Sequence, residues 1–193
     1  MQIRIDWAQF TAREVHLGDL VTLQEVRLEA AGLQARTRDG SGLRVADLSA
    51  RLVVDEAALN RALRAQPTGR VRDLEVALLS DRVRISGHYA IGGPMALPFS
   101  FTAVPEIEGG ARIRLEPRQL VLAVVSMPGF SAQIVGEQVN ATLAHAFDVT
   151  RLPIPCRLTG VTAETGRLVL TATAVLELRP DGSSIVPAEA SPR

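Results

Sequence analysis

Alternating apolar and polar positions dominate the chain and predict a mainly β-stranded protein. The clearest strand spans 167–178, where one face is wholly apolar and consists of Leu168, Leu170, Ala172, Ala174, Leu176 and Leu178. Residues 161–164 alternate in the same way, and Thr165-Gly166 can close a two-residue hairpin between the two segments. That turn places Ala163 opposite Leu168 and Val161 opposite Leu170.

A second hairpin is predicted within 71–91. A two-residue turn at Ser80-Asp81 pairs apolar positions with apolar positions, namely Leu78 with Val83 and Val76 with Ile85. Further strands are predicted at 95–103, 112–116 and 120–124, and in the first third at 2–6, 24–37 and 43–54. In the last two segments the apolar parity switches midway, which predicts β-bulges or bends and therefore a strongly curved sheet.

Only two segments have a helical period. The first is 55–65, with Asp55 as the N-cap and Pro67 beyond its end. The second is 131–147, whose apolar stripe is Val135, Val139, Leu143 and Phe147. Because this stripe is wide, the helix must pack against a concave apolar surface.

These elements predict an α+β fold, mainly antiparallel β, in which a highly curved sheet wraps around the 131–147 helix. A flat two-sheet sandwich is the alternative. Residues 1–179 are expected to form one domain. The composition of residues 180–193, rich in Pro and Ser, predicts a disordered C-terminal tail.

Composition narrows the classes of function. Hydrophobic residues make up 47% of the 193 residues, and 21 basic residues, all arginine, balance 21 acidic ones. Without a basic excess, a nucleic-acid partner is not expected. The longest apolar run, 120–125, is far shorter than the roughly 20 residues of a spanning helix, and the N-terminus has no signal-peptide pattern. A cytoplasmic or membrane-peripheral location is therefore expected.

Residues capable of catalysis are few and scattered. Cys156 is the only cysteine, and His16, His88 and His145 lack the spacing of a metal site. A Cys–His nucleophile pair is conceivable, but no nucleophile elbow or helix N-terminus supports it. We therefore expect a protein that is not an enzyme and that uses neither a metal nor a cofactor.

Three stretches resemble the LmeA-like phospholipid-binding family of bacteria, which belongs to the tubular lipid-binding superfamily. They are the strand-then-helix run 48–63 (LSARLVVDEAALNRAL), the central hairpins 71–117 with their Gly93-Pro94 junction, and Leu152-Pro-Ile-Pro with 161–172 behind it. The resemblance covers about 48–178 and leaves the first 45 or so residues without a counterpart.

The resemblance implies binding or transfer of a phospholipid or another acyl-chain ligand, and it allows peripheral contact with a membrane. The ligand is expected in an apolar groove between sheet and helix. Parity and the helical stripe select its lining as Leu97, Phe99, Phe101, Val135, Val139, Leu143, Phe147, Leu168 and Leu170. The alternative is a β-rich interaction or scaffolding module with a filled core and no ligand. The sequence indicates no particular oligomeric state.

Overall fold

The structure, a computed structural model, describes residues 2–17, 21–36, 43–65, 69–92, 95–122, 135–141 and 156–178. The predicted tail, 180–193, lies outside these residues. The strands are β1 (Gln2–Leu17), β2 (Val21–Arg36), β3 (Leu43–Asp55), β4 (Val71–Leu79), β5 (Arg82–Gly92), β6 (Met95–Glu108), β7 (Arg112–Leu122), β8 (Arg157–Glu164) and β9 (Arg167–Leu178). The helices of the described part are α1 (Glu56–Arg64) and a short helix at 135–141.

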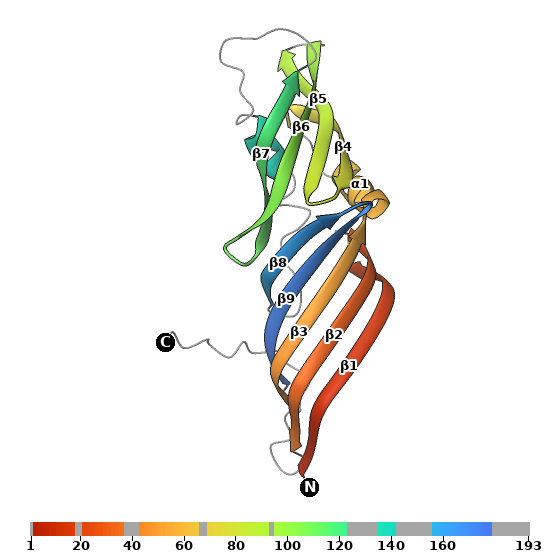
Figure 1. The fold of residues 1–193 in the computed structure, drawn as a ribbon, viewed down its shortest axis with the longest axis vertical. Coiled ribbons are helices and arrows are strands. Elements are labelled where there is room, and N and C mark those ends of the chain that lie inside the picture. Colours follow the sequence, from red (N-terminus) through yellow and green to blue (C-terminus); the bar gives the residue numbers. More distant parts are fainter. Residues whose placement is uncertain are drawn as a thin grey trace.

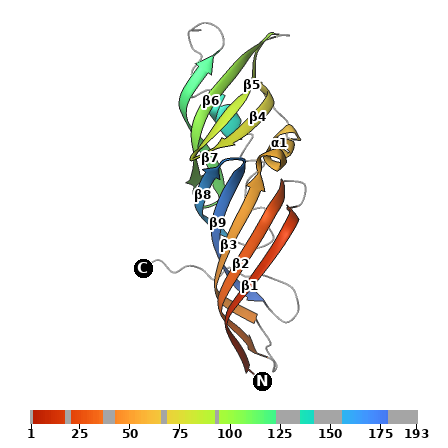
Figure 2. The same cartoon turned by 45° about the vertical axis from the view of Figure 1, so that its right-hand side comes forward.

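The strands form two open antiparallel sheets. Sheet A has the order β1-β2-β3-β9-β8 and sheet B the order β4-β5-β6-β7. Sheet B lies beyond one end of sheet A along the long axis of the molecule, with α1 beside the junction (Figures 1 and 2). The prediction of a mainly antiparallel β protein is confirmed, whereas the single curved sheet is wrong. The division arises because α1 follows β3 directly and carries the chain away, so that β4 starts a second meander.

Both predicted two-residue hairpins are confirmed, with the predicted register. Val76 pairs with Ile85 and Leu78 with Val83 around a turn in which Asp81 has φ +59°. In the second hairpin Ala163 pairs with Leu168 and Val161 with Leu170, and Gly166 has φ +77°. Because glycine lacks a Cβ, it adopts this left-handed conformation without strain.

The predicted irregularities in the two long N-terminal strands are also confirmed. In β3 the register against β9 shifts between Val45 and Leu48. In β2 the chain passes through Gly32, whose φ is +67°. A bulge or a left-handed residue changes which side chains face one side of a sheet, which explains the switch in apolar parity.

Helix α1 begins at the predicted N-cap. The Asp55 carboxylate accepts a hydrogen bond of 2.5 Å from the backbone N–H of Ala58, satisfying one of the free donors of the first turn. The helix buries Ala58, Leu59, Ala62 and Leu63.

The predicted long helix is described only over 135–141, with Val135 and Val139 buried. The rest of 131–147, including Leu143 and Phe147, lies outside the described residues. The described helix contacts β7, and a long helix enclosed by one curved sheet is not what these residues form. A Cβ added at Gly136 would come within 2.6 Å of the Pro117 ring, which shows how closely helix and strand approach.

Asparagine side chains close both edges of sheet B. On the β4 edge, the Asn60 carboxamide accepts from the Val76 N–H and donates to the Val76 carbonyl, both at 2.8 Å. On the β7 edge, Asn140 accepts from the Leu115 N–H at 2.8 Å and donates to its carbonyl at 2.9 Å. Each carboxamide therefore replaces the hydrogen bonds that a neighbouring strand would make.

The hairpin turns of sheet B contact the β8 edge of sheet A. The backbone N–H of Asp81 donates to the Ala163 carbonyl at 2.9 Å, and the N–H of Leu158 donates to the Gly110 carbonyl at 2.8 Å. These bonds join the two sheets end to end.

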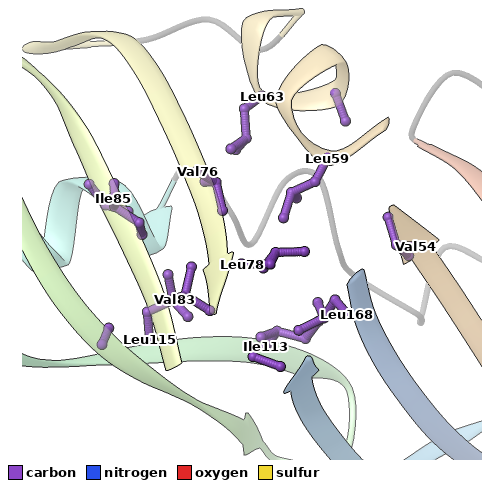
Figure 3. Packing of buried hydrophobic residues seen from close by; sticks show 14 of the residues in the cluster. Val54, Leu59, Leu63, Val76, Leu78, Val83, Ile85, Ile113, Leu115 and Leu168 are labelled. Atoms are coloured by element: carbon purple, nitrogen blue, oxygen red, sulfur yellow. The ribbon is translucent and has the colours of Figure 1, made fainter. Parts of the chain in front are cut away.

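One hydrophobic cluster, here called the junction core, links the two sheets. Leu59 and Leu63 of α1 lie opposite side chains of sheet B, while Val54 and Leu168 enter from sheet A (Figure 3). The sheet B side chains labelled there are Val76, Leu78, Val83, Ile85, Ile113 and Leu115.

Candidate functional site

The inner face of sheet A is apolar across four neighbouring strands. Cross-strand pairing aligns its side chains in three rows, each running from β1 through β2 and β3 to β9. The rows are Ala12–Val26–Leu52–Leu170, Phe10–Leu28–Ala50–Ala172 and Ala8–Ala30–Leu48–Ala174. This face has no polar side chain in these rows, so it offers a broad apolar surface.

Exposure along the inner face increases toward β1. Leu170 and Ala172 on β9 are 3% and 2% exposed and belong to the junction core. Leu28 and Ala50 are only partly buried against that core. Phe10, at the β1 end of the same row, is 60% exposed. The face therefore leads without a polar interruption from the protein interior to an exposed aromatic ring.

The junction core itself is tightly packed. Between the sheets lies a wholly apolar cavity of about 20 Å³, lined by Leu59, Val76, Leu78, Val83, Pro105, Ile113, Leu115 and Leu168. A single water needs at least about 10–15 Å³, and ligand pockets measure roughly 300–1,000 Å³. Among the described residues, this cavity is too small for an acyl chain.

The structure brings most of the predicted lipid-contacting residues together. Six of the nine belong to the junction core: Phe99, Phe101, Val135, Val139, Leu168 and Leu170. Leu97 is half-buried on β6 opposite Tyr89, while Leu143 and Phe147 lie outside the described residues. As lipid contacts, all nine stay predictions.

Phe99 is fixed by its neighbours in sheet B. It pairs with Gly87 on β5, and a Cβ added there would lie 3.2 Å from the Phe99 ring and 2.9 Å from the Arg72 carbonyl oxygen. The rings of Phe99 and Phe101 stack, with centroids 6.1 Å apart. Gly87 therefore makes room for the phenylalanine that covers it.

The exposed part of the inner face was not anticipated as a site. Phe10, Leu28 and Ala50 share one row, but no sequence pattern indicates that these strands are neighbours in this register. A partial signal existed in the alternating apolar residues at 8–12 and 26–30, which mark one apolar face on each of the two strands.

Groups capable of catalysis do not gather in the described part of the chain. There, no cluster of three or more His, Cys, Asp and Glu residues could hold a metal ion. Cys156 is partly buried, and burial raises the pKa of its thiol. His88 Nδ1 lies 3.3 Å from the Asp73 carboxylate, and both side chains are exposed. The carboxamide of Asn140 is engaged by the backbone of Leu115.

The fold and the two-sided sheet define an antiparallel β protein with an extended apolar surface. The model of the LmeA-like phospholipid-binding family matches residues 1–173. The chain therefore belongs to this family, as the resemblance in its sequence indicated. The match begins at residue 1, so the N-terminal strands, which had no assigned counterpart, are part of the family region. No curated protein and no solved structure matches the chain.

Among the described residues, neither helix has the length and apolar character needed to cross a membrane.

Proposed function

We propose that this protein binds a phospholipid by its acyl chains along the inner face of sheet A and carries it between membranes without chemical change. The observation behind the proposal is the unbroken apolar surface from Leu170 in the core to the exposed Phe10. Membership of a phospholipid-binding family supports the same ligand class.

An acyl chain gains free energy by covering this face. Each methylene moved from water to an apolar surface contributes about 0.8 kcal/mol, so roughly ten methylenes contribute about 8 kcal/mol before the cost of ordering the chain. Phe10 and Leu28 would lose contact with water at the same time. The polar headgroup would remain at the open β1 side, because the core offers it no partners.

The predicted contacts in the junction core would form the inner end of the site. Leu168 and Leu170 continue the inner face, and Phe99 and Phe101 approach from sheet B. Since the cavity there is only about 20 Å³, a chain that reaches these residues requires the two sheets to move apart. Leu28 and Phe10 would therefore contact the ligand first.

Lipid content of the purified protein tests the proposal. Native mass spectrometry and lipid extraction should recover phospholipid, and a fluorescent acyl probe should displace it. Phe10→Ser should lower uptake of the acyl probe from solution, whereas Trp7→Ser is a matched control because both residues are on β1, both are 60% exposed, and Trp7 lies on the opposite face. Ala50→Phe should also lower this uptake by filling the middle of the row. Absence of bound lipid together with absence of probe uptake would overturn the proposal.

Binding rather than catalysis is part of the proposal. A nucleophilic cysteine needs a lowered pKa, whereas burial raises the pKa of Cys156. A thiol reagent should therefore label native Cys156 more slowly than a model thiol. Labelling faster than the model thiol would revive the enzyme hypothesis.

The alternative, an interaction module, is favoured by one feature, the outer edge of β1. Within the described residues, side chains or turns bond to the edges of β4, β7 and β8, whereas β1 ends sheet A. A partner strand could add there. Light scattering tests this: self-association of a lipid-free protein would support the alternative, and a lipid-carrying monomer would contradict it.

A further inference from the structure

The outer face of sheet A, opposite the inner face, combines an exposed tryptophan with arginines. The β1–β2 register is uninterrupted from Trp7↔Ala31 to Arg13↔Glu25, so Trp7 and Arg13 point to the same side. Trp7 is 60% exposed, and Ile5, 47% exposed, precedes it on the same strand. Six residues of strand place Trp7 and Arg13 about 20 Å apart.

Three arginines on this face lie around the Glu25 carboxylate, and two of them are paired with it. Arg27 and Arg51 lie directly opposite each other on β2 and β3, and they approach the same oxygen of Glu25 at 3.6 Å and 3.8 Å. Arg13 lies opposite Glu25 on the other side. Direct charge-assisted hydrogen bonds measure about 2.7–2.9 Å, so Glu25 satisfies neither Arg27 nor Arg51 fully.

Donors of this arginine cluster (Arg13, Arg27 and Arg51) remain unused. The Nε of Arg27 is buried and has no hydrogen-bond partner in the described structure. Over the same described residues, no ion pair or hydrogen bond engages the Arg13 guanidinium. Glu14 and Glu29 also lie beside these arginines, so the unused guanidinium donors, rather than a net positive charge, are what an anion would engage.

An open groove of about 380 Å³ lies beside the cluster. Its lining is Arg13, Glu14, Gln24, Glu25, Arg51, Val53 and Arg167. Glu14 has φ +53°, and this left-handed turn of β1 explains how two consecutive side chains line one groove. Arg167 is paired with Glu164 at 2.5 Å, so Arg13 and Arg51 are the cations available in the groove.

We propose that the outer face of sheet A docks on the surface of an anionic phospholipid bilayer. The arginine cluster contacts lipid phosphates, which guanidinium forks match in geometry and charge, and Trp7 enters the interfacial layer, where amphipathic aromatic rings are favoured. A soluble anion would account for the arginines but not for an exposed tryptophan on the same face. The inference deepens the proposed function, because a protein that takes up a phospholipid must first reach a bilayer.

Trp7 is the only tryptophan in the chain, so its fluorescence reports on this face alone. Vesicles of phosphatidylcholine containing phosphatidylglycerol should shift its emission to shorter wavelength and should sediment the protein, and added salt should reverse both effects. Vesicles of phosphatidylcholine alone should do neither. Inorganic phosphate at matched ionic strength should leave the emission unchanged.

Arginine variants test how much the cluster contributes to the affinity for anionic vesicles. Removing one basic residue near an anionic surface weakens binding roughly fivefold, so Arg13→Gln combined with Arg51→Gln should weaken it roughly 25-fold. Trp7→Ser should also weaken sedimentation with anionic vesicles. Two controls, Arg84→Gln and Met95→Ser, change exposed residues of sheet B and should have little effect.

Three results would overturn the inference: no binding to anionic vesicles, sedimentation without a Trp7 emission shift, or equal loss in the sheet B controls. Uptake of a fluorescent acyl probe from solution separates this inference from the proposed function, because that uptake does not require contact with a bilayer. The arginine variants should lose docking yet take up the probe as the wild type does. Phe10→Ser should show the reverse, with probe uptake lost and docking intact.

Discussion

Replacing Asn60 or Asn140 by alanine should uncover an edge of sheet B. Each replacement removes two hydrogen bonds of 2.8–2.9 Å, one to the N–H and one to the carbonyl of Val76 or Leu115. A typical hydrogen bond contributes about 0.5–1.5 kcal/mol net, so each variant should lose about 1–3 kcal/mol of unfolding free energy. Small domains have only about 5–15 kcal/mol in total, so the double variant should be severely weakened.

Urea denaturation followed by circular dichroism measures this loss. The midpoint should fall in each variant while the slope stays unchanged, because the surface exposed on unfolding is the same. The two asparagines serve opposite edges of the sheet, so their effects should add to within about 0.5 kcal/mol.

Asn60→Asp is a control that keeps the size of the side chain and changes only its hydrogen-bonding groups. Its carboxylate can still accept from the Val76 N–H but faces the Val76 carbonyl with a second acceptor, which should raise the pKa of the new carboxyl. The stability of this variant should therefore be highest at acidic pH and fall as the pH rises. Losses below about 0.5 kcal/mol in both alanine variants would refute the reasoning, because ordinary surface positions behave in that way.

Other parts of the fold give further expectations. Gly87→Ala should lower stability by about 1–3 kcal/mol in urea denaturation because a Cβ would meet the Phe99 ring at 3.2 Å, whereas Gly69→Ala, with no neighbour nearer than 3.8 Å, should cost little. Asp55→Ala should cost about 0.5–2 kcal/mol and reduce helical circular dichroism first on heating, and equal melting curves would contradict the cap. Burial raises the pKa of Cys156 above its ordinary 9.0, so its contribution to stability should be complete below pH 9 and be lost as the pH rises through the folded pKa. Cys156→Ala should remove this loss of stability above pH 9. If the variant and the wild type lose unfolding free energy equally above pH 9, the prediction is wrong.

Local features of this fold could be predicted because neighbouring residues determine them. The turns at Ser80-Asp81 and Thr165-Gly166 fix hairpin register, and Asp55 fixes the start of α1. The continuation of β1 beyond residue 6 was not predicted, because its apolar residues move from odd positions (Ile5, Trp7) to even ones (Ala8, Phe10, Ala12).

The partition into two sheets could not be predicted from local pattern. It depends on pairing β3 with β9 rather than with β4, and both neighbours offer suitable apolar residues. The inner face depends on the same pairing, since Ala50 meets Ala172 only when β9 lies beside β3. Parity indicates which residues share a face of one strand, but it does not indicate which strands are adjacent.

That β3–β9 pairing has a consequence for how the protein is made. The strands β1–β3 and then β4–β7 form consecutive meanders, so both can fold as the chain leaves the ribosome. β9 is synthesised after all of sheet B, and until it arrives β3 has an open edge and the junction core lacks Leu168 and Leu170. Insertion of the β8–β9 hairpin should therefore be the slow step of folding, since distant segments must meet before their contacts stabilise anything. We therefore expect the nascent chain to be most prone to aggregation in the interval between the synthesis of β3 and that of β9.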